Sequence, residues 1–236
     1  MTEICAIEIH KLRQYIGDVE VLNIPDLQIQ QGECVCIQGS NGSGKTALLR
    51  LLTGLTQPTS GQVAVLGNDM KAIKSSVLNR LRSDSIGFVF QHYRLIPYLS
   101  ALDNMLLPCH FSSVRAAEAE TGSRSMTEDV FRLIRKLRLK DPSRLSKKAT
   151  DYSAGQQQRF AIVRAVIGKP SLVLADEPAS AMDQQGRQAV YQFLLEECRA
   201  NGMTLLCTTH DDMDTEGFDR VIDMDALNQA REHELR

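Results

Sequence analysis

Short apolar runs alternate with segments of helical periodicity along most of the chain. Runs typical of buried strands lie at residues 33–39, 62–67, 85–90, 171–176, 203–209 and 219–224. Residues 45–54 and 185–200 instead place apolar side chains at the three- and four-residue spacing of a helix that buries one face. Strands that alternate with helices predict an α/β fold, in which helices flank a largely parallel sheet.

Residues 100 to about 150 have a different character. They contain helix-forming segments but no convincing strand. Residues 108–125 show weak periodicity, which predicts a loop within this block. The block as a whole therefore predicts a helical lobe inserted into the α/β core.

The composition is that of a globular chain, and it limits the possible partners. Of 236 residues, 43% are hydrophobic, and 27 Lys+Arg against 29 Asp+Glu give a formal charge of −2. A chain of this length buries about 70% of its unfolded surface, so folding requires no disulfide or metal. The balanced charge argues against a nucleic-acid partner, because non-specific binding depends on neutralising phosphates with Lys and Arg.

The sequence predicts neither a membrane span nor an export signal. No apolar run approaches the roughly 20 residues of a spanning helix. Residues 1–14 lack the basic start and apolar stretch of a signal peptide, so we expect a cytoplasmic protein. The cysteines form no C-x-x-C pair and have no histidine at ligand spacing. We therefore expect small buried hydrophobic residues and no zinc site.

The strongest local signal is GSNGSGKT at residues 39–46, between a predicted strand and a predicted helix. It matches the phosphate-loop pattern G-x-x-x-x-G-K-[ST], whose glycines let successive backbone N–H groups curl around phosphate oxygens. In that pattern Lys45 reaches the β- and γ-phosphates and the Thr46 hydroxyl is a ligand of Mg²⁺. The alternative, a glycine-rich turn without a ligand, is disfavoured by the strand–loop–helix context.

A second signal is SLVLADEP at residues 171–178. The apolar strand ends at Asp176, which is suited to holding Mg²⁺, and Glu177 follows directly. A carboxylate at that position can orient or deprotonate the water that attacks a γ-phosphate. Alone, the two acids are equally consistent with an ordinary strand end, but the phosphate-loop pattern favours the catalytic interpretation.

Three further elements complete a fixed order of motifs. They are YSAGQQQR at residues 152–159, Gln91 after the strand GFVF, and His210 after the strand LLCTT. Each is common in isolation. Together with the phosphate loop and the ADEP segment, they resemble the ATP-binding cassette (ABC) ATPase family over about residues 4–225.

The resemblance implies a P-loop NTPase core, a mainly parallel sheet flanked by helices, with an antiparallel β subdomain and an inserted α-helical subdomain. It implies a single ABC ATPase domain over residues 1–236. Residues 1–90 and 155–236 are expected to form the core with the β subdomain. Residues 91–154 are expected to form the helical subdomain, with the signature motif, which begins at Tyr152, at its end.

The resemblance also assigns ATP and Mg²⁺ to individual residues. The loop expected to bind the ATP phosphates comprises Gly39, Ser40, Asn41, Gly42, Ser43, Gly44, Lys45 and Thr46. The metal is expected at Thr46, Asp176 and Gln91.

The catalytic residues implied by the resemblance are Glu177, His210, Gln91 and Lys45. Glu177 is the expected base, Gln91 contacts the attacking water, and His210 contacts the γ-phosphate. Tyr15 is placed to stack on adenine, with an ordinary surface tyrosine in a hairpin as the alternative.

In the family, the signature segment does not touch the ATP bound by its own chain. Ser153, Gly155 and Gln156 are expected to contact the γ-phosphate held by a second subunit, and Asp183 crosses the same interface. Because one chain carries one set of motifs, the resemblance implies a second copy of the chain. Two ATP molecules would then be sandwiched in a head-to-tail dimer.

Three positions depart from the family pattern. The usual signature L-S-G-G-Q has Tyr152 in place of Leu and Ala154 in place of the first Gly. Alanine is tolerated there unless the residue needs a positive φ. Residues 180–183 resemble the D-loop of the family, and there Met182 replaces the usual leucine, which conserves volume. No catalytic group is lost, so we expect activity to be lowered at most.

The run IGFVFQHYRLIPYLSALDNMLLP at residues 86–108 looks like that of the group including LolD, MacB and FtsE. Members of this group couple ATP to membrane subunits that act on periplasmic or outer-leaflet cargo. In that comparison Gln91–Pro108 receives a coupling helix of an integral membrane subunit, and core packing of the helical lobe is the alternative. The implied function is an ATPase subunit on the inner face of the cell membrane, for export, extraction or release of a substrate.

Residues 132–148 carry eight Lys/Arg and a single acid. A solvated helix face is the favoured interpretation. The alternative is a surface that faces anionic lipid, where each charge contributes about 1 kcal/mol.

Two other functions fit parts of the sequence. A soluble ABC-type ATPase acting on DNA or ribosomes usually adds a long coiled coil or a second cassette, which we do not expect in 236 residues. A regulatory module that binds ATP without useful turnover is disfavoured by Glu177 and His210, although Tyr152 and Ala154 leave it open.

Overall fold

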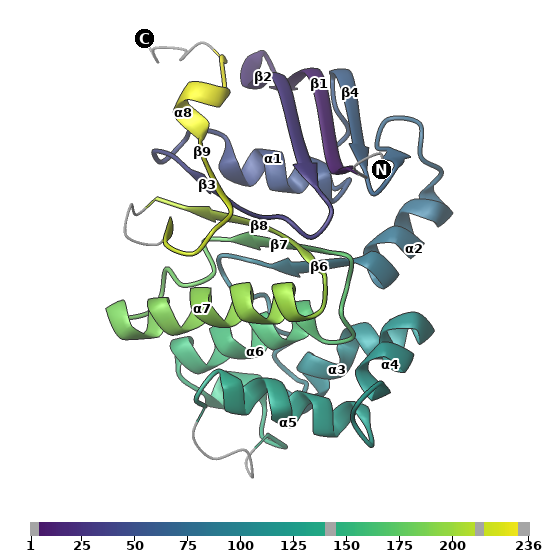
Figure 1. Cartoon of the computed structure of the whole chain (residues 1–236), viewed down its shortest axis with the longest axis vertical. Coiled ribbons are helices and arrows are strands. Elements are labelled where there is room, and N and C mark those ends of the chain that lie inside the picture. The colour runs from purple at the N-terminus through teal and green to yellow at the C-terminus, as the bar shows by residue number, and fades with distance from the viewer. Residues whose placement is uncertain (1–4, 140–144, 211–214, 231–236) are drawn as a thin grey trace.

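The computed structural model describes residues 5–139, 145–210 and 215–230. They form an antiparallel sheet and a parallel sheet, with helices packed around the parallel one (Figure 1). In this view the antiparallel sheet and α1 (Lys45–Leu52) lie above the parallel sheet, and the helices of the inserted block lie below it. The fold class predicted from the sequence is confirmed.

The antiparallel sheet is built on a long hairpin. β1 (Cys5–Ile16) pairs with β2 (Val19–Gln30), and β4 (Ser60–Val65) and β5 (Asn68–Asp69) extend the sheet in the order β2-β1-β4-β5. Gly17 turns the hairpin with a φ of 59°, in the region that favours glycine. Buried and more exposed residues largely alternate along β2, as expected of a sheet with one covered face.

The parallel sheet has the strand order β6-β7-β8-β3-β9. Its strands are β3 (Cys34–Gln38), β6 (Ile86–Val89), β7 (Leu172–Asp176), β8 (Thr204–Thr209) and β9 (Arg220–Asp223). β7 and β8 are buried along their whole length, so burial does not alternate along either strand. The predicted strand at residues 62–67 also exists, as β4 of the antiparallel sheet.

Helices surround the parallel sheet and make up the inserted block. Besides α1 they are α2 (Ser75–Ser85), α3 (Ala101–Phe111), α4 (Ser113–Glu120), α5 (Met126–Lys136), α6 (Ala154–Val166), α7 (Gln184–Ala200) and α8 (Met224–Leu227), with a short 3-10 helix at Ala149–Asp151. α1 and α7 confirm the helices predicted at residues 45–54 and 185–200. We call α3, α4 and α5 together the helical lobe.

The loop predicted within residues 108–125 is confirmed at residues 121–125, and the rest of this stretch is helical apart from Ser112. α3 continues to Phe111 and α4 begins two residues later, so only residues 121–125 connect helices as a loop. Ser112 caps α4 by accepting a hydrogen bond from the backbone N–H of Arg115 at 3.1 Å. The break at Ser112 shifts the apolar phase between two short helices, so no single period spans the segment.

Two apolar clusters cover opposite faces of the parallel sheet. Along β7, Leu172 and Leu174 belong to the cluster shared with the antiparallel sheet and α1. Val173 and Ala175 belong to the cluster shared with the helical lobe, α6 and α7. The alternation follows from the two-residue period of a strand. Packing on both faces therefore fixes the carboxyl ends of the strands, where the candidate site lies.

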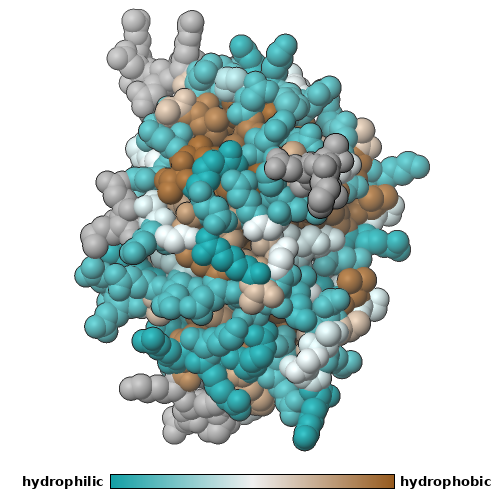
Figure 2. Space-filling model, viewed as in Figure 1, coloured by the Kyte–Doolittle hydropathy of each residue, from teal (hydrophilic) through white to brown (hydrophobic). Residues whose placement is uncertain are grey.

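Ion pairs join the helical lobe to α7. The buried carboxylate of Glu197 accepts hydrogen bonds from Arg132 Nη2 at 2.7 Å and from Lys136 Nζ at 2.6 Å. Two cations of the basic stretch 132–148 thus hold α5 against α7, while residues 140–144 of that stretch lie outside the described residues. Figure 2 shows a mostly hydrophilic surface over α7 and α5.

All six cysteines are free, and five of them are buried. Burial raises the pKa of Cys34 and of Cys109 to about 11, so both are neutral thiols. This confirms the prediction of small buried hydrophobic residues for all but Cys5. Within the described ranges, no helix is long and apolar enough to cross a membrane.

Candidate active site

The phosphate-loop residues connect the end of β3 to the start of α1. Gly42 and Gly44 have φ values of 89° and 101°, which other residues rarely adopt. A Cβ on Gly44 would lie 2.8 Å from Leu22 Cδ2 and 3.0 Å from the carbonyl oxygen of Val21, both on β2. The loop therefore needs glycine both for its turn and for the close approach of β2.

Lys45 and Thr46 begin α1 and turn their polar groups toward the loop and β7. The buried Lys45 ammonium donates to the carbonyl oxygens of Gly39 and Ser40, at 2.8 Å each. The Thr46 hydroxyl donates to Asp176 Oδ2 at 2.9 Å. The first turn of α1 thus supplies an ammonium group over the loop and a hydroxyl that pairs with the carboxylate of β7 at the edge of the sheet.

Asp176 is the last residue of β7 and is only 5% exposed. Thr208 is its partner in the parallel register of β8 and donates from Oγ1 to Asp176 Oδ1 at 3.0 Å. Hydroxyl and carboxylate oxygens are the hard ligands that Mg²⁺ prefers, and this ion keeps several waters besides its few protein ligands. The pair of Thr46 and Asp176 therefore fits Mg²⁺.

Glu177, Gln91 and His210 converge beside this pair. Glu177 has a φ of 44°, a strained value for a non-glycine residue that is often found at functional sites. Its Oε2 accepts a hydrogen bond from Gln91 Nε2 at 3.1 Å and lies 3.4 Å from His210 Nδ1. Gln91 follows β6, Glu177 follows β7 and His210 follows β8, so three adjacent strands supply one cluster.

Thr208 belongs to this cluster, although no sequence motif includes it. Its hydroxyl donates to Asp176, and it accepts the backbone N–H of Glu177 at 3.1 Å. The only sequence signal is its place near the end of the apolar strand LLCTT, where a buried hydroxyl needs a partner. Beside the cluster is a cavity of about 290 Å³ lined by Gln38, Gly39, Ser40, His210, Asp223 and Asp225.

Tyr15 lies on β1, opposite Glu20 of β2. Its hydroxyl donates to Glu20 Oε1 at 2.8 Å, and its backbone N–H donates to Thr59 Oγ1 at 3.2 Å. The residue is 36% exposed. These contacts keep it on the antiparallel sheet and do not join it to the phosphate loop, so the adenine-stacking role stays a prediction.

The signature residues form a cluster of their own at the start of α6. Ser153 caps the helix, and its backbone N–H donates to Gln156 Oε1 at 3.0 Å in a reciprocal capping box. A Cβ on Gly155 would meet nothing within 4 Å. Asp183 caps α7 by accepting the backbone N–H of Gly186 at 2.9 Å. The polar groups of both caps are satisfied locally, and the signature cap lies beside open space at Gly155.

A glycine loop between a strand and a helix, and a buried acid at the end of a parallel strand, define a P-loop nucleotide-binding protein. The ABC transporter family matches residues 22–180 of the chain. The chain belongs to that family. The lipoprotein-releasing system ATP-binding protein LolD of Syntrophotalea carbinolica is 37% identical over 206 residues, which are 87% of each chain. LolD of Porphyromonas gingivalis is 34% identical over 218 residues, 92% of this chain and 95% of its own.

Solved structures agree with the sequence comparison. A bacterial ABC transporter cassette, solved as a dimer, is 29% identical, with a TM-score of 0.79 over 93% of this chain and 95% of that chain. The same cassette in a post-hydrolysis state bound to ADP and Pi gives a TM-score of 0.77 at 28% identity over the same shares. The fold is that of an ABC ATPase cassette, and the resemblance found from the motifs is confirmed.

Proposed function

We propose that this chain is the ATP-binding and ATP-hydrolysing subunit of an ABC transporter complex. The observation that carries the proposal is the convergence of Gln91, Glu177 and His210 beside the Thr46–Asp176 pair. Phosphoryl transfer to water needs a base, groups that position the water and the phosphate, and oxygen ligands for a divalent cation. A module that only senses ATP needs no such base.

Binding of ATP starts with a rearrangement of Lys45. Its ammonium leaves the carbonyl oxygens of Gly39 and Ser40 and turns to the β- and γ-phosphates, while the loop N–H groups hold phosphate oxygens. Thr46, Asp176 and Gln91 are the residues that would hold Mg²⁺. When bound, this ion neutralises charge that develops on the phosphate oxygens.

Glu177 then accepts a proton from the attacking water through its carboxylate, and Gln91 orients the same water. His210 lies beside the same oxygen of this carboxylate, and its role is to contact the γ-phosphate. Thr208 bonds both the Asp176 carboxylate and the Glu177 backbone. It therefore keeps the cation ligand and the base in a constant relative position.

A second copy of the chain completes the site. We assign Ser153, Gly155, Gln156 and Asp183 to the ATP held by that copy, in a head-to-tail dimer. Their satisfied caps and the open space at Gly155 support a surface that meets a partner. The similar cassette that was solved as a dimer gives further support.

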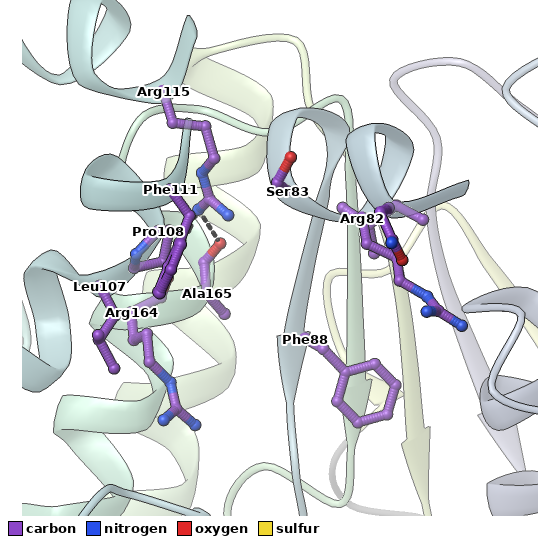
Figure 3. A pocket seen from close by; sticks show the side chains of 11 residues that line it. Arg82, Ser83, Phe88, Leu107, Pro108, Phe111, Arg115, Arg164 and Ala165 are labelled. Carbon is purple, nitrogen blue, oxygen red and sulfur yellow. Dashed lines mark hydrogen bonds between the residues drawn. The ribbon is translucent and has the colours of Figure 1, made fainter. Parts of the chain in front are cut away.

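A groove beside α2, β6 and α3 is the proposed seat of the membrane subunit (Figure 3). The groove, of about 400 Å³, is lined among others by Arg82, Phe88, Leu107, Pro108, Phe111, Arg115 and Arg164. Phe111 is 77% exposed, and Tyr98 in the preceding segment is 75% exposed. Exposed apolar groups around a groove are typical of an interface. Two of the lining residues belong to Gln91–Pro108, the segment predicted to receive a coupling helix.

The arginines of the groove bond backbone carbonyls rather than acids. Arg115 donates to the carbonyl oxygen of Ala165 at 2.7 Å, the dashed line in Figure 3, and Arg82 and Arg164 donate to carbonyls of neighbouring loops. Burial lowers the pKa of Arg115 and of Arg164 to about 10, so both remain cations at neutral pH. A helix with apolar side chains and an acidic residue fits this groove.

The relatives are named as ATP-binding proteins of a lipoprotein-releasing system. This name supports export, extraction or release of a substrate at the membrane as the work that hydrolysis drives. We place the chain on the inner face of the cell membrane, held there by its partner subunits. A soluble ATPase would have no such partner.

The test combines phosphate release with capture of partners from detergent-solubilised membranes. The unmodified chain should release phosphate from ATP in the presence of Mg²⁺, and Lys45→Ala should remove this activity. Phe111→Asp should reduce capture of an integral membrane protein, whereas Val114→Asp, 55% exposed on α4 outside the groove, should not. Capture of only ribosomal or DNA-repair proteins would overturn the transporter assignment.

A further inference from the structure

The short helix α8 lies directly against the phosphate loop. Asp223 ends β9 and caps α8 by accepting the backbone N–H of Asp225 at 2.9 Å. Met224 is fully buried, and a Cβ on Gly39 would lie 2.9 Å from Met224 Cβ. This contact sets α8 against the first residue of the loop, although none of the motifs described above includes α8.

Asp225 bonds the second residue of the loop twice. Its Oδ2 accepts the backbone N–H of Ser40 and its Oδ1 accepts the Ser40 hydroxyl, both at 2.8 Å. These two hydrogen bonds, with a smaller effect of the Lys45 charge, lower the pKa of Asp225, so the carboxylate is ionised at neutral pH. Paired hydrogen bonds to a charged group fix the orientation of Ser40.

Asn228 holds the loop at a second point. Its Nδ2 donates to the carbonyl oxygen of Ser43 at 2.8 Å and to that of Val21 at 3.0 Å. Its Oδ1 accepts the backbone N–H of Asn23 at 2.7 Å. Asn228 therefore connects the loop to β2, the strand that also packs against Gly44.

We propose that Asp225 and Asn228 are positioning residues that hold the phosphate loop in its phosphate-binding shape before nucleotide arrives. The inference rests on the proposed ATP-binding function. The Ser40 N–H is bonded to Asp225, the Ser43 carbonyl to Asn228 and the Ser43 N–H to the Ser40 carbonyl oxygen at 3.2 Å. These bonds fix the backbone of the loop beside the N–H groups of Gly44, Lys45 and Thr46, which open α1 toward the phosphates. A loop that is ordered beforehand loses less conformational entropy on binding.

The Asp225 carboxylate also has an effect of the opposite sign. It lines the cavity shared with His210 and Gly39, where a negative charge repels phosphate. If positioning dominates, removal of the carboxylate weakens nucleotide binding. If repulsion dominates, removal strengthens it. The sign of the change in affinity therefore separates the two effects.

The experiment measures the dissociation constant of ADP by calorimetry for the unmodified chain, Asp225→Ala and Asp225→Asn. Asp225→Ala should raise it about tenfold, the loss of roughly one charged hydrogen-bond pair. Asp225→Asn should stay within about threefold, because an amide can still accept from the Ser40 N–H and bond its hydroxyl. Asp26→Ala is the matched control, since it removes an exposed aspartate and its 2.6 Å bond to His10 on β1.

A second measurement needs no nucleotide. Amide hydrogen exchange at residues 40–46 should be faster in Asp225→Ala, and in Asn228→Ala, than in the unmodified chain. Equal exchange together with equal or tighter ADP binding in Asp225→Ala would overturn the positioning role. If the unmodified chain itself bound no ADP, the proposed ATP function would fail instead, so the two failures are distinguishable.

Discussion

The phosphate loop and the signature segment are both turns that open a helix, but they differ in where their polar groups are bonded. Around the phosphate loop, Asp176 on β7 and Asp225 on α8 reach groups of the loop and of α1. At the signature, Ser153 and Gln156 bond each other. The phosphate loop is bonded by residues that are distant in sequence, whereas the polar groups of the signature segment bond within the segment. This difference fits the proposed dimer, in which each ATP would be shared between two subunits.

A hydrogen bond connects the two regions through the interior. Gln158, two residues after the signature glutamine, is buried on α6 and donates from Nε2 to the carbonyl oxygen of Pro178 at 2.7 Å. Pro178 follows Glu177 directly. Movement of the signature helix would therefore affect the backbone next to the proposed base. In the proposed dimer, this bond would link the ATP that Ser153 contacts to the other ATP site, where Glu177 acts.

The largest expected effect comes from the base itself. Glu177→Gln keeps the size of the side chain but cannot take a proton, so phosphate release should fall about 10²- to 10⁴-fold. ATP binding should persist, and size-exclusion chromatography with ATP should show a dimer that the unmodified chain populates less. Normal turnover in this variant would remove Glu177 from the mechanism.

A complementation experiment tests whether the two regions act across subunits. Gly155→Asp fits within the chain, because a Cβ there meets nothing within 4 Å, but it puts a carboxylate where the partner's ATP would lie. Gly155→Asp and Lys45→Ala should each be inactive alone. Mixed in equal amounts they should recover up to about a quarter of normal phosphate release, because half of random dimers carry one intact site.

Recovery in the mixture also has a control. Glu177→Gln mixed with Lys45→Ala damages the phosphate-loop half of both sites, so no intact site forms in any dimer. Activity in this second mixture equal to that of the first would contradict the assignment of Ser153, Gly155 and Gln156 to the other subunit's ATP.

A smaller effect is expected where α5 is held against α7. Arg132→Ala leaves the buried Glu197 with Lys136 as its cation. Breaking a fully buried ion pair costs about 3–5 kcal/mol, but Arg132 is more than a third exposed here, so a loss of about 1–2 kcal/mol is expected. Denaturant unfolding measures it, and Arg135→Ala on the same helix is the control. Equal losses in the two variants would contradict a specific link.

The same pair gives a pH dependence with a definite sign. Burial raises the pKa of Glu197, but hydrogen bonds from Arg132 and Lys136 outweigh burial and lower it. A carboxyl with a lowered folded-state pKa contributes stability above its unfolded pKa, about 4.3, and loses that contribution as pH falls through the folded value. The difference in unfolding free energy between the unmodified chain and Arg132→Ala should therefore shrink below about pH 4.

Sequence patterns predict the parallel sheet because its inner strands are continuous apolar runs, whereas other elements give weak signals. α2 buries only Leu81, so it has almost no apolar face to reveal it. β1 carries polar residues on its more exposed face, and its pairing is clear only from the family resemblance. Residues 108–125 show only weak periodicity because Ser112 separates two short helices.

The residues of the candidate site also differ in whether the sequence reveals them. Lys45, Thr46, Asp176 and Glu177 are found because each motif is continuous in sequence. Thr208 and Asp225 act through contacts that depend on the β7–β8 register and on the packing of α8 over the loop. No spacing along the chain encodes those contacts, so only the folded structure reveals them.

The smallest expected effect concerns Ala154, where the family usually has glycine. Ala154 is the first residue of α6 and does not have a positive φ, so the position does not need glycine. Ala154→Gly should lower the free energy of unfolding by about 0.5–1 kcal/mol at most, because glycine is a poorer helix former. Phosphate release should stay within about twofold, as for most exposed substitutions. A large rise in turnover would instead mean that the alanine methyl group obstructs the partner's ATP. The signature segment, rather than the phosphate loop, would then limit the rate.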